Sequence, residues 1–273
     1  MHIVAIIQAR MASSRLPGKV LQNINGRPML AWVVERAQQA RQLTELVVAT
    51  TTEEDDDVVA QWCAERRVSY YRGAALDVLD RYYQTACAFK ADVVVRLTAD
   101  CPFLDPALVD AVVARFVAAF PRLDFATNRL PPPWGRSFPI GLDVEVMTMI
   151  ALGRAWREAR KPHQREHVTP YFYETAPPEA LCFTPQGPRW REATTPRGFR
   201  VALYHAGQNW GQLRWTVDTP QDLAFAQALA GNMGEVALDW QAIRRWLEAH
   251  PEVRALNETV RHKTHQDIDA RLQ

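Results

Sequence analysis

Cysteine is scarce in this 273-residue sequence, and its placement argues against a disulfide-built scaffold. The four cysteines are Cys63, Cys87, Cys101 and Cys182, and no two of them form a C-x-x-C pair. A chain of this length buries enough apolar surface to fold without covalent cross-links. We therefore expect all four cysteines to be reduced.

Net charge and long apolar runs are also missing. The formal net charge of +1 argues against a polybasic nucleic-acid module. The composition, with 48% hydrophobic and 23% charged residues, argues against disorder. The apolar runs Ile3–Ile7 and Val93–Val95 fall far short of the ~20 residues of a membrane span. Arg10 follows the first run too closely for a secretory signal. These absences predict a cytoplasmic protein with neither a nucleic-acid nor a membrane partner.

Short β-rich runs alternate with helical patterns over the first 125 residues. The predicted strands are Ile3–Gln8, Glu45–Thr50, Val68–Tyr71 and Val93–Leu97, and the predicted helices are Met29–Ala40, Asp55–Arg66, Leu76–Phe89 and Pro106–Phe120. A strand that is apolar on both faces, such as Val93–Leu97, is typical of a parallel sheet covered by helices. The pattern predicts a three-layer α/β fold with a mostly parallel sheet.

Beyond residue 125 the pattern loosens into a proline-rich loop, Leu130–Gly135, of the kind that often carries substrate contacts. The elements expected after it are strands at Asp143–Met147, Phe199–Tyr204 and Leu213–Val217, and helices at Met149–Ala159, Val168–Thr175, Pro220–Ala230 and Trp240–Ala249. No repeat or low-complexity tract interrupts the chain. We predict a single domain over residues 1–273, with a helical C-terminal extension at about 235–273.

The segment that leaves the first strand, Gln8–Lys19, is rich in small and basic residues. A loop at the carboxyl end of a parallel strand exposes backbone N–H groups to the ligand crevice, and Arg10, Arg15 and Lys19 add three cations. The pattern indicates a cradle for a triphosphate, although a solvated basic loop would have the same composition. It lacks the P-loop spacing, and no G-x-G-x-x-G occurs in the sequence.

Two aspartates are candidate metal ligands. Asp100 follows the apolar strand Val93–Leu97, so its carboxylate should emerge at the same sheet edge as the cradle. Asp218, after the predicted strand Leu213–Val217, is the natural second carboxylate, although Asp-Thr-Pro at this point also reads as a helix N-cap. Because Mg²⁺ prefers carboxylate and phosphate oxygens, the pattern predicts a Mg²⁺ site at Asp100 and Asp218.

Motifs along nearly the whole chain resemble one family. They are Ala9-Arg10, Ser14–Lys19, Arg72-Gly73, Asp77–Tyr82, Arg96–Pro102, Gly141–Glu145, Glu166–Pro170 and Thr216–Pro220. In this order they resemble the CMP-sugar synthetases, which are cytidylyltransferases that activate sialic-type and other ulosonic acids, and especially the spore-coat-polysaccharide (SpsF-like) branch. Ala12 departs from the pattern, since relatives usually carry Gly there.

The resemblance implies a Rossmann-like nucleotide-diphosphosugar transferase (GT-A-like) fold and a homodimer. It also implies a Mg²⁺-dependent reaction in which CTP and an ulosonic or sialic-like acid, or a related hydroxyl acceptor, give a CMP-conjugate and pyrophosphate. The choice of CTP over UTP or GTP comes from the resemblance alone. Two alternatives stay open. The first is a sugar-nucleotide-dependent glycosyltransferase, which would usually show a D-x-D pair, whereas Asp100 is followed here by Cys101-Pro102. The second is a catalytically silent nucleotide-binding protein.

The resemblance also implies the residues of the nucleotide site, where cations hold the departing pyrophosphate. The nucleotide-binding candidates are Ala9, Arg10, Arg15, Lys19, Arg72, Asp77, Arg81 and Asp100, of which Arg10, Arg15, Lys19 and Asp100 are the catalytic candidates. Asp77 and Arg81 also form an i,i+4 pair that any solvated helix can carry. The acidic run Glu53–Asp57 is interpreted as helix capping, because acids complement the positive end of a helix dipole.

The acceptor-binding candidates are Asp143, Glu145, Arg165, Glu166 and His167. Asp143 and Glu145 are two residues apart on a predicted strand, so their side chains share one face and could bind sugar hydroxyls. In the alternative interpretation, this face is simply polar and exposed. His163–His167 matches the H-x-x-E-H pattern of zinc peptidases, but Pro170 would cut its helix short. An ulosonic-acid carboxylate should meet an arginine, for which Arg96, Arg129 and Arg165 are open candidates.

Overall fold

One eight-stranded sheet lies at the centre of the computed structural model, which describes residues 1–233 and 239–262. Along the sheet the strands are β5 (Ser69–Gly73), β4 (Glu45–Thr51), β1 (Ile3–Gln8), β6 (Val93–Thr98), β8 (Glu145–Thr148), β7 (Phe125–Thr127), β10 (Arg200–Tyr204) and β9 (Trp190–Thr194). All of these strands except β8 and β9 run in one direction. A short hairpin of β2 (Asn23–Ile24) and β3 (Arg27–Pro28) lies outside this sheet.

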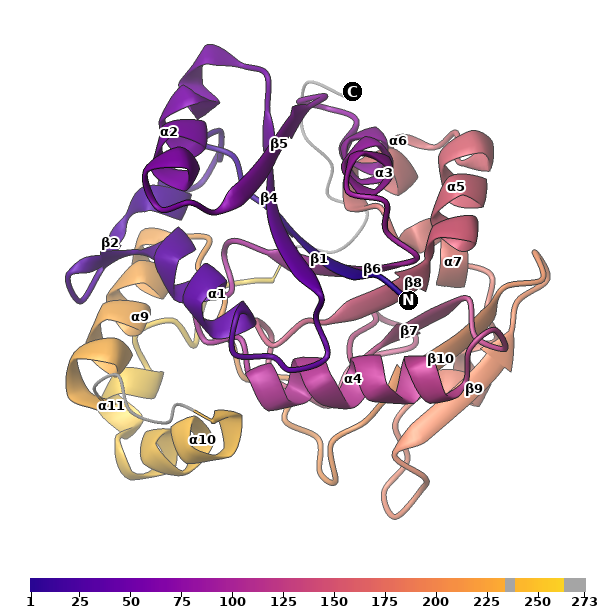
Figure 1. Cartoon of the computed structure of the whole chain (residues 1–273). Helices are drawn as coiled ribbons and strands as arrows, with labels where there is room; N and C mark the ends of the chain where they lie inside the picture. The colour runs from indigo at the N-terminus through magenta and orange to yellow at the C-terminus, as the bar shows by residue number, and fades with distance from the viewer. Residues whose placement is uncertain (234–238, 263–273) are drawn as a thin grey trace.

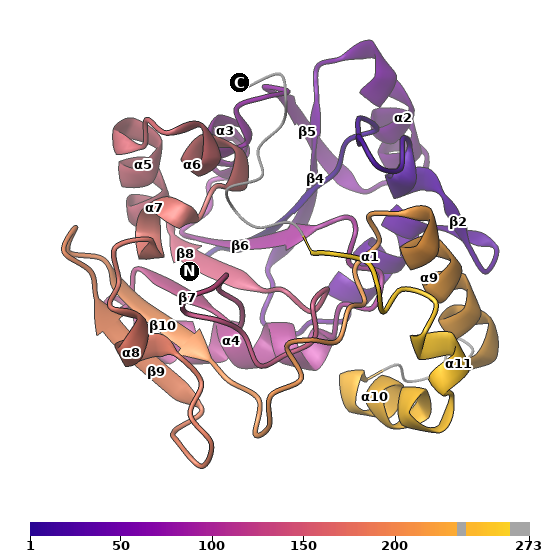
Figure 2. The ribbon, with the colours of Figure 1, turned by 180° about the vertical axis from the view of Figure 1, so that it is seen from behind.

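Helices cover both faces of the sheet (Figures 1 and 2). One face carries α1 (Met29–Ala37), α2 (Asp57–Glu65) and α4 (Pro106–Ala118), and the other carries α3 (Val78–Ala88), α5 (Met149–Glu158) and α7 (Pro170–Tyr173), with the short α6 (Pro162–His167) and α8 (Pro178–Leu181) beside them. Alternate residues of β1 point to opposite layers: Ala5 packs in the first core cluster and Ile6 in the second. The three-layer α/β fold with a mostly parallel sheet is confirmed.

Local chemistry explains where the helices of the first half begin. The Asp105 carboxylate accepts the N–H of Ala107 at 2.8 Å and caps α4, whose first residue is Pro106. Asp77 caps α3 in the same way, accepting the N–H of Asp80 at 2.9 Å. The sequence pattern therefore places these elements within a few residues of their observed bounds.

Three predictions for the second half are wrong. Leu213–Val217 is not a strand, since it makes only an isolated bridge between Ile140 and Arg214 and the opposite chain turns away at Gly141, where φ is +105°. The predicted helix Val168–Thr175 starts late, because Val168 adopts a φ of 68° and Pro170 opens the separate helix α7. The predicted strand Asp143–Met147 begins only at Glu145, so Asp143 lies in the preceding loop.

Two strands of the eight-stranded sheet escape the sequence pattern, as does the short β2–β3 hairpin outside it. β7 has only three residues, which is too short for any periodicity to show. β9 lies inside the proline-rich stretch and pairs only with β10 at the edge of the sheet, where alternate residues need not be apolar.

The C-terminal helices lie together beside α1 and the β2–β3 hairpin (Figure 1). They are α9 (Pro220–Met233), α10 (Trp240–Ala249) and α11 (Pro251–Arg254). Two 3₁₀ turns occur earlier in the chain, η1 (Lys19–Leu21) after β1 and η2 (Glu54–Asp56) after β4. Their apolar side chains form a third core cluster with Met29 and Trp32 of α1. Of the predicted extension, residues 235–238 and 263–273 lie outside the described residues.

Within the described part of the chain, no helix is both long and apolar enough to span a membrane. All four cysteines are free thiols, and Cys63 and Cys101 are buried.

Candidate active site

A cavity of about 1480 Å³ opens at the carboxyl ends of β1 and β6. This is the edge of an open parallel sheet at which ligands usually bind. Ten of the predicted site residues line it: Ala9, Arg10, Arg15, Lys19, Arg81, Asp100, Asp143, Glu166, His167 and Asp218. The tertiary structure thus brings most of both predicted sites to one place.

The cradle loop is closed on itself and anchored to a neighbouring segment. The N–H of Gly18 donates to the carbonyl of Met11 at 2.9 Å, and Gly18 adopts a φ of +68° that favours glycine. The buried Asp56 carboxylate, in η2, accepts the N–H of Met11 at 2.6 Å and the hydroxyl of Thr51. These bonds hold the loop against the end of β4 and fix the backbone that faces the cavity.

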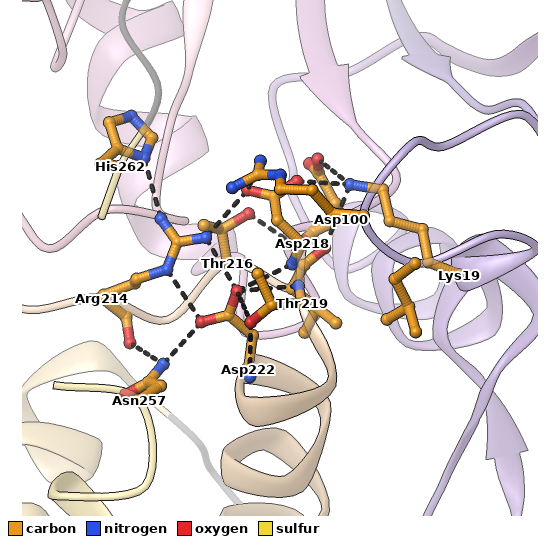
Figure 3. Close-up of polar contacts among 12 residues, drawn as sticks. Lys19, Asp100, Arg214, Thr216, Asp218, Thr219, Asp222, Asn257 and His262 are labelled. Atoms are coloured by element: carbon orange, nitrogen blue, oxygen red, sulfur yellow. Dashed lines mark hydrogen bonds and ion pairs between the residues drawn. The ribbon is translucent and has the colours of Figure 1, made fainter. Parts of the chain in front are cut away.

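Lys19 joins the two predicted metal ligands. Its Nζ donates to Oδ2 of Asp100 and to Oδ1 of Asp218, both at 2.7 Å, and to the carbonyl of Val217 at 3.1 Å. Arg15 lies within 3.1 Å of Oδ2 of Asp218. Two carboxylates and two cations from distant parts of the sequence therefore converge at the floor of the cavity. Figure 3 shows Lys19 directed at Asp100 and Asp218.

Charge pairing keeps Asp218 and Lys19 ionised although both side chains are largely shielded from solvent. Burial alone would raise the pKa of Asp218, but Lys19, Arg15 and Arg214 outweigh it and hold that pKa well below its ordinary value. Burial opposes the charge of Lys19 as well, yet the two aspartates raise its pKa. The cavity floor therefore carries a cation that can bind a polyanionic ligand and a carboxylate that can bind its metal counterion.

Asp218 does not cap α9, so the alternative interpretation of the Asp-Thr-Pro motif is wrong for this residue. The cap is Thr219, whose Oγ1 accepts the N–H of Asp222 at 3.2 Å, while the Asp222 carboxylate accepts the N–H of Thr219 at 3.0 Å. This reciprocal arrangement leaves the Asp218 side chain directed at Lys19 (Figure 3).

Carboxylates and arginines alternate on the opposite wall of the cavity. Asp143 accepts hydrogen bonds from Arg136 at 2.7 Å and from Arg129 at 3.1 Å. Burial opposes ionisation of Asp143, but these arginines lower its pKa to about 2. Glu145 is buried beneath this wall, pairs with Arg96 and accepts the hydroxyl of Thr169 at 2.7 Å. Arg129 lies near both carboxylates, 3.1 Å from Asp143 and 3.9 Å from Glu145, but only Asp143 lines the cavity.

Three further candidates lie outside the cavity lining. Arg165 donates to Asp77 at 3.0 Å and to the carbonyl of Trp156 at 2.7 Å, a contact that ties α6 to the start of α3. Arg72 donates to the carbonyls of Thr51 and Glu53 at 2.8 and 3.0 Å. Arg72, Asp77 and Arg165 therefore hold the surrounding elements in place, and direct ligand contact by them remains a prediction.

Arg81 lines the cavity although it is buried in α3. Its Nη1 donates to the carbonyl of Ala74 at 2.6 Å, and burial lowers its pKa to about 10. The adjacent wall carries Glu166 and His167.

The zinc-peptidase interpretation of His163–His167 finds no support in the geometry. His163 lines a separate cavity and lies 2.9 Å from Oε2 of Glu174, whereas His167 lines the main cavity. Among residues 1–233 and 239–262, no three His, Cys, Asp or Glu side chains are grouped to hold a metal ion.

Sequence reasoning missed four residues at or behind this site. Arg136 and His262 line the cavity, Arg214 contacts Asp218 at 2.9 Å, and Asp56 anchors the cradle loop. No periodic or motif signal marks His262, which follows a polar stretch. Asp56 lies in the acidic run interpreted as capping, but its side chain makes no capping bond to its own helix.

Comparison with known proteins identifies the family. The sequence matches the family model described as cytidylyltransferase over residues 4–243. It is 32% identical over 237 residues to the spore coat polysaccharide biosynthesis protein SpsF of Bacillus subtilis, which covers 85% of this chain and 88% of that protein. It is also 32% identical over 245 residues to a 3-deoxy-manno-octulosonate cytidylyltransferase of Anaeromyxobacter dehalogenans, covering 84% and 97% of the two chains.

A solved structure shares the whole architecture. The cytidylyltransferase of Leptospira borgpetersenii superposes with a TM-score of 0.82 at 28% identity, covering 96% of this chain and 100% of that one. The predicted nucleotidyltransferase fold and the resemblance drawn from the motifs are both confirmed. The chain belongs to the cytidylyltransferase family.

Proposed function

We propose that this enzyme transfers CMP from CTP to a hydroxyl group of an ulosonic or sialic-like acid, or a related sugar-type acceptor, and releases pyrophosphate with Mg²⁺ as cofactor. The observation that carries the proposal is the convergence of Arg15 and Lys19 with Asp100 and Asp218 at the floor of the cavity. Such a site offers cations for phosphates and carboxylates for a metal ion within one hydrogen-bonded group.

The chemistry of the donor set fits Mg²⁺. Asp100 and Asp218 each place one oxygen 2.7 Å from the same ammonium nitrogen, so the two carboxylates already converge on a cation. Since Mg²⁺ commonly takes one or two protein carboxylates and completes its shell with phosphate oxygens and water, no larger protein cage is required. When bound there, Mg²⁺ would supply Lewis-acid stabilisation of the charge that develops on the transferred phosphoryl group.

The chain's own residues bind and orient the triphosphate. Arg10, Arg15 and Lys19 would hold the departing pyrophosphate, with Lys19 exchanging its carboxylate partners for phosphate oxygens. The backbone of Ala9 and of the closed cradle loop would contact the nucleotide at the end of β1. Positioning and electrostatics therefore carry most of the rate.

The acceptor would bind on the wall that carries Asp143, Glu166 and His167. Of the three arginines considered for its carboxylate, Arg96 and Arg129 line the cavity, whereas Arg165 is engaged with Asp77. This placement supports Arg96 or Arg129. The similarity to a 3-deoxy-manno-octulosonate cytidylyltransferase supports an acidic sugar as the acceptor.

Pyrophosphate release tests the proposal. The assay combines the enzyme, Mg²⁺ and each of the four ribonucleoside triphosphates with ulosonic acids, sugar 1-phosphates and phosphonates as acceptors. Release that requires both CTP and a sugar acid would support the proposal. Turnover with a different nucleotide, or CTP binding without release for any acceptor, would contradict it.

The homodimer and the cytoplasmic location stay predictions from the resemblance and the composition. Light scattering coupled to size-exclusion chromatography measures the mass of the particle directly, and a mass near the 31.1 kDa of one chain would contradict the dimer.

A further inference from the structure

Residues 250–262, which follow α10, reach the floor of the active site through Arg214 (Figure 3). The Arg214 guanidinium is buried and has three partners. Its Nη2 donates to Oδ2 of Asp218 at 2.9 Å, its Nε donates to Oδ1 of Asp222 at 2.8 Å, and its Nη1 donates to Nδ1 of His262 at 2.9 Å. The guanidinium therefore connects Asp218, α9 and the C-terminal segment.

Asn257 connects the backbone of Arg214 with the Asp222 carboxylate. Its Nδ2 donates to the carbonyl of Arg214 at 3.1 Å and to Oδ1 of Asp222 at 3.0 Å. Asn257 is 3% exposed, and Val253 of α11 belongs to the third core cluster. The segment is thus packed against the body of the protein before it reaches the cavity, which His262 lines.

The two oxygens of Asp218 face different partners. Oδ1 accepts from Lys19 at 2.7 Å, while Oδ2 is held by Arg214 at 2.9 Å and by Arg15 at 3.1 Å. Arg15 and Lys19 are the cations proposed to move to the triphosphate, whereas Arg214 does not line the cavity. Arg214 is therefore the cation that would stay with Asp218 when nucleotide binds and that would keep its carboxylate in one orientation.

We propose that Arg214, held by Asn257 and His262, is a positioning residue that orients Asp218, so that residues 250–262 are part of the active site. This inference rests on the proposed role of Asp218 as a metal ligand. Groups behind a metal ligand fix its orientation, and their loss commonly weakens metal binding 10- to 100-fold.

The test compares variants by Mn²⁺ binding in the presence of CTP without acceptor. The electron paramagnetic resonance signal of free Mn²⁺ gives the bound metal after correction for the Mn²⁺ that CTP binds in a titration without protein. We expect Arg214→Met to raise the Mn²⁺ Kd by about 10- to 100-fold. Because that variant leaves the buried Asp222 without its main partner and is therefore at risk of misfolding, His262→Leu and Asn257→Ala probe the same contact more mildly. Both should raise the Mn²⁺ Kd by at least about threefold. This effect is smaller than the 10- to 100-fold expected for loss of the supporting group itself, because Arg214 is still present.

Two controls separate positioning from a general structural effect. His262→Asn keeps an acceptor near the position of Nδ1 and should restore most of the Mn²⁺ affinity lost in His262→Leu. Arg254→Ala removes an exposed side chain of the same segment, whose guanidinium lies 3.9 Å from the Glu258 carboxylate. This variant should bind Mn²⁺ like the wild type. Thermal unfolding checks that each variant is folded.

The outcomes also separate this inference from the proposed function. Wild-type Mn²⁺ affinity in folded Asn257→Ala and His262→Leu, with weakened binding in Asp218→Asn, would overturn the inference and leave the metal site intact. Wild-type affinity in Asp218→Asn itself would overturn both. Weakened binding in all three variants, with recovery in His262→Asn, is the expected result.

Discussion

Lys19 has a central position among single residues because its ammonium group touches both aspartates of the cavity floor. We expect Lys19→Ala to lower kcat/KM by at least about 100-fold, the usual scale for loss of one charge-stabilising group. The fold should persist, since Asp218 keeps Arg15 and Arg214. Steady-state kinetics measures the effect, with Lys90→Ala, at an exposed lysine after α3, as the matched control. Near-wild-type turnover in a folded Lys19→Ala would rule out the role assigned to the lysine.

Asp143 should make the protein sensitive to acid. Its pKa of about 2 lies below the ordinary 3.8, so its ion pairs stabilise the folded state above about pH 4, and this contribution is lost as the pH falls toward 2. A shift of this size corresponds to about 2 kcal/mol. Asp143→Asn should therefore be less stable than the wild type at pH 6, with the difference shrinking below pH 4. Melting temperatures between pH 6 and pH 3 measure the difference, and a constant gap across this range would contradict the assignment.

Among the elements, the cradle loop depends on an anchor outside its own sequence. Asp56 accepts the N–H of Met11 and the hydroxyl of Thr51. Asp56→Ala leaves both donors without this acceptor, which should cost about 2 kcal/mol of stability. It should also raise the KM for CTP about tenfold. The unanchored cradle loop must then be ordered when CTP binds, and a cost of about 1.4 kcal/mol corresponds to a factor of ten. Glu65→Ala, at the exposed end of α2, is the control. An unchanged KM in Asp56→Ala would show that the loop needs no anchor.

Close backbone packing at Gly141 holds the segments of Asp143 and Asp218 together. Gly141 has a φ of +105°, and an added Cβ would lie 2.6 Å from the backbone nitrogen of Thr216. Gly141→Ala should therefore lose at least about 2 kcal/mol of stability, from strain and overpacking. Gly231→Ala, in α9 with open space at the Cβ position, should be neutral or slightly stabilising. Urea unfolding compares the two, and equal stability of the variants would contradict this account.

At the scale of the whole molecule, the cavity joins the cradle after β1, the end of β6 and the loops before β8 and α9. A ligand that bridges these segments stabilises the folded state by mass action. CTP with Mg²⁺ at 100 times its Kd should add about 2.7 kcal/mol, which for a chain of this size raises the Tm by roughly 5–10 °C. Differential scanning fluorimetry with all four nucleotides measures this shift. An equal shift with each of them would contradict cytosine selectivity.

The first half of the fold could be predicted because its elements are long and bounded by local signals. β1 has the expected bounds, and β6 and α4 differ from theirs by one and two residues. In the second half, α10 is a long helix and also has the expected bounds. The second half contains short or polar elements, such as β7 and β9, whose pairing supplies order that periodicity cannot show. The break at Val168 and the turn at Gly141 depend on single backbone angles.

The site divides along the same line. The cradle and Asp100 were predictable because the parallel strands β1 and β6 end at one sheet edge. Asp218 was predicted from its sequence motif, since the strand expected before it does not form. The supporting roles of Arg72 and Arg165 could not be predicted from the sequence. Each side chain contacts residues that only tertiary packing brings near it.

The sequence by itself determined the fold class, the family and the cations and carboxylates of the cavity floor, because local periodicity and contiguous motifs carry that information. Only the tertiary structure decided which side chains support them. Asp56 meets a loop 45 residues away, and Arg214 meets His262 at a separation of 48 residues. Contacts over such separations leave no local pattern in the chain, since they form only when distant elements pack against one another.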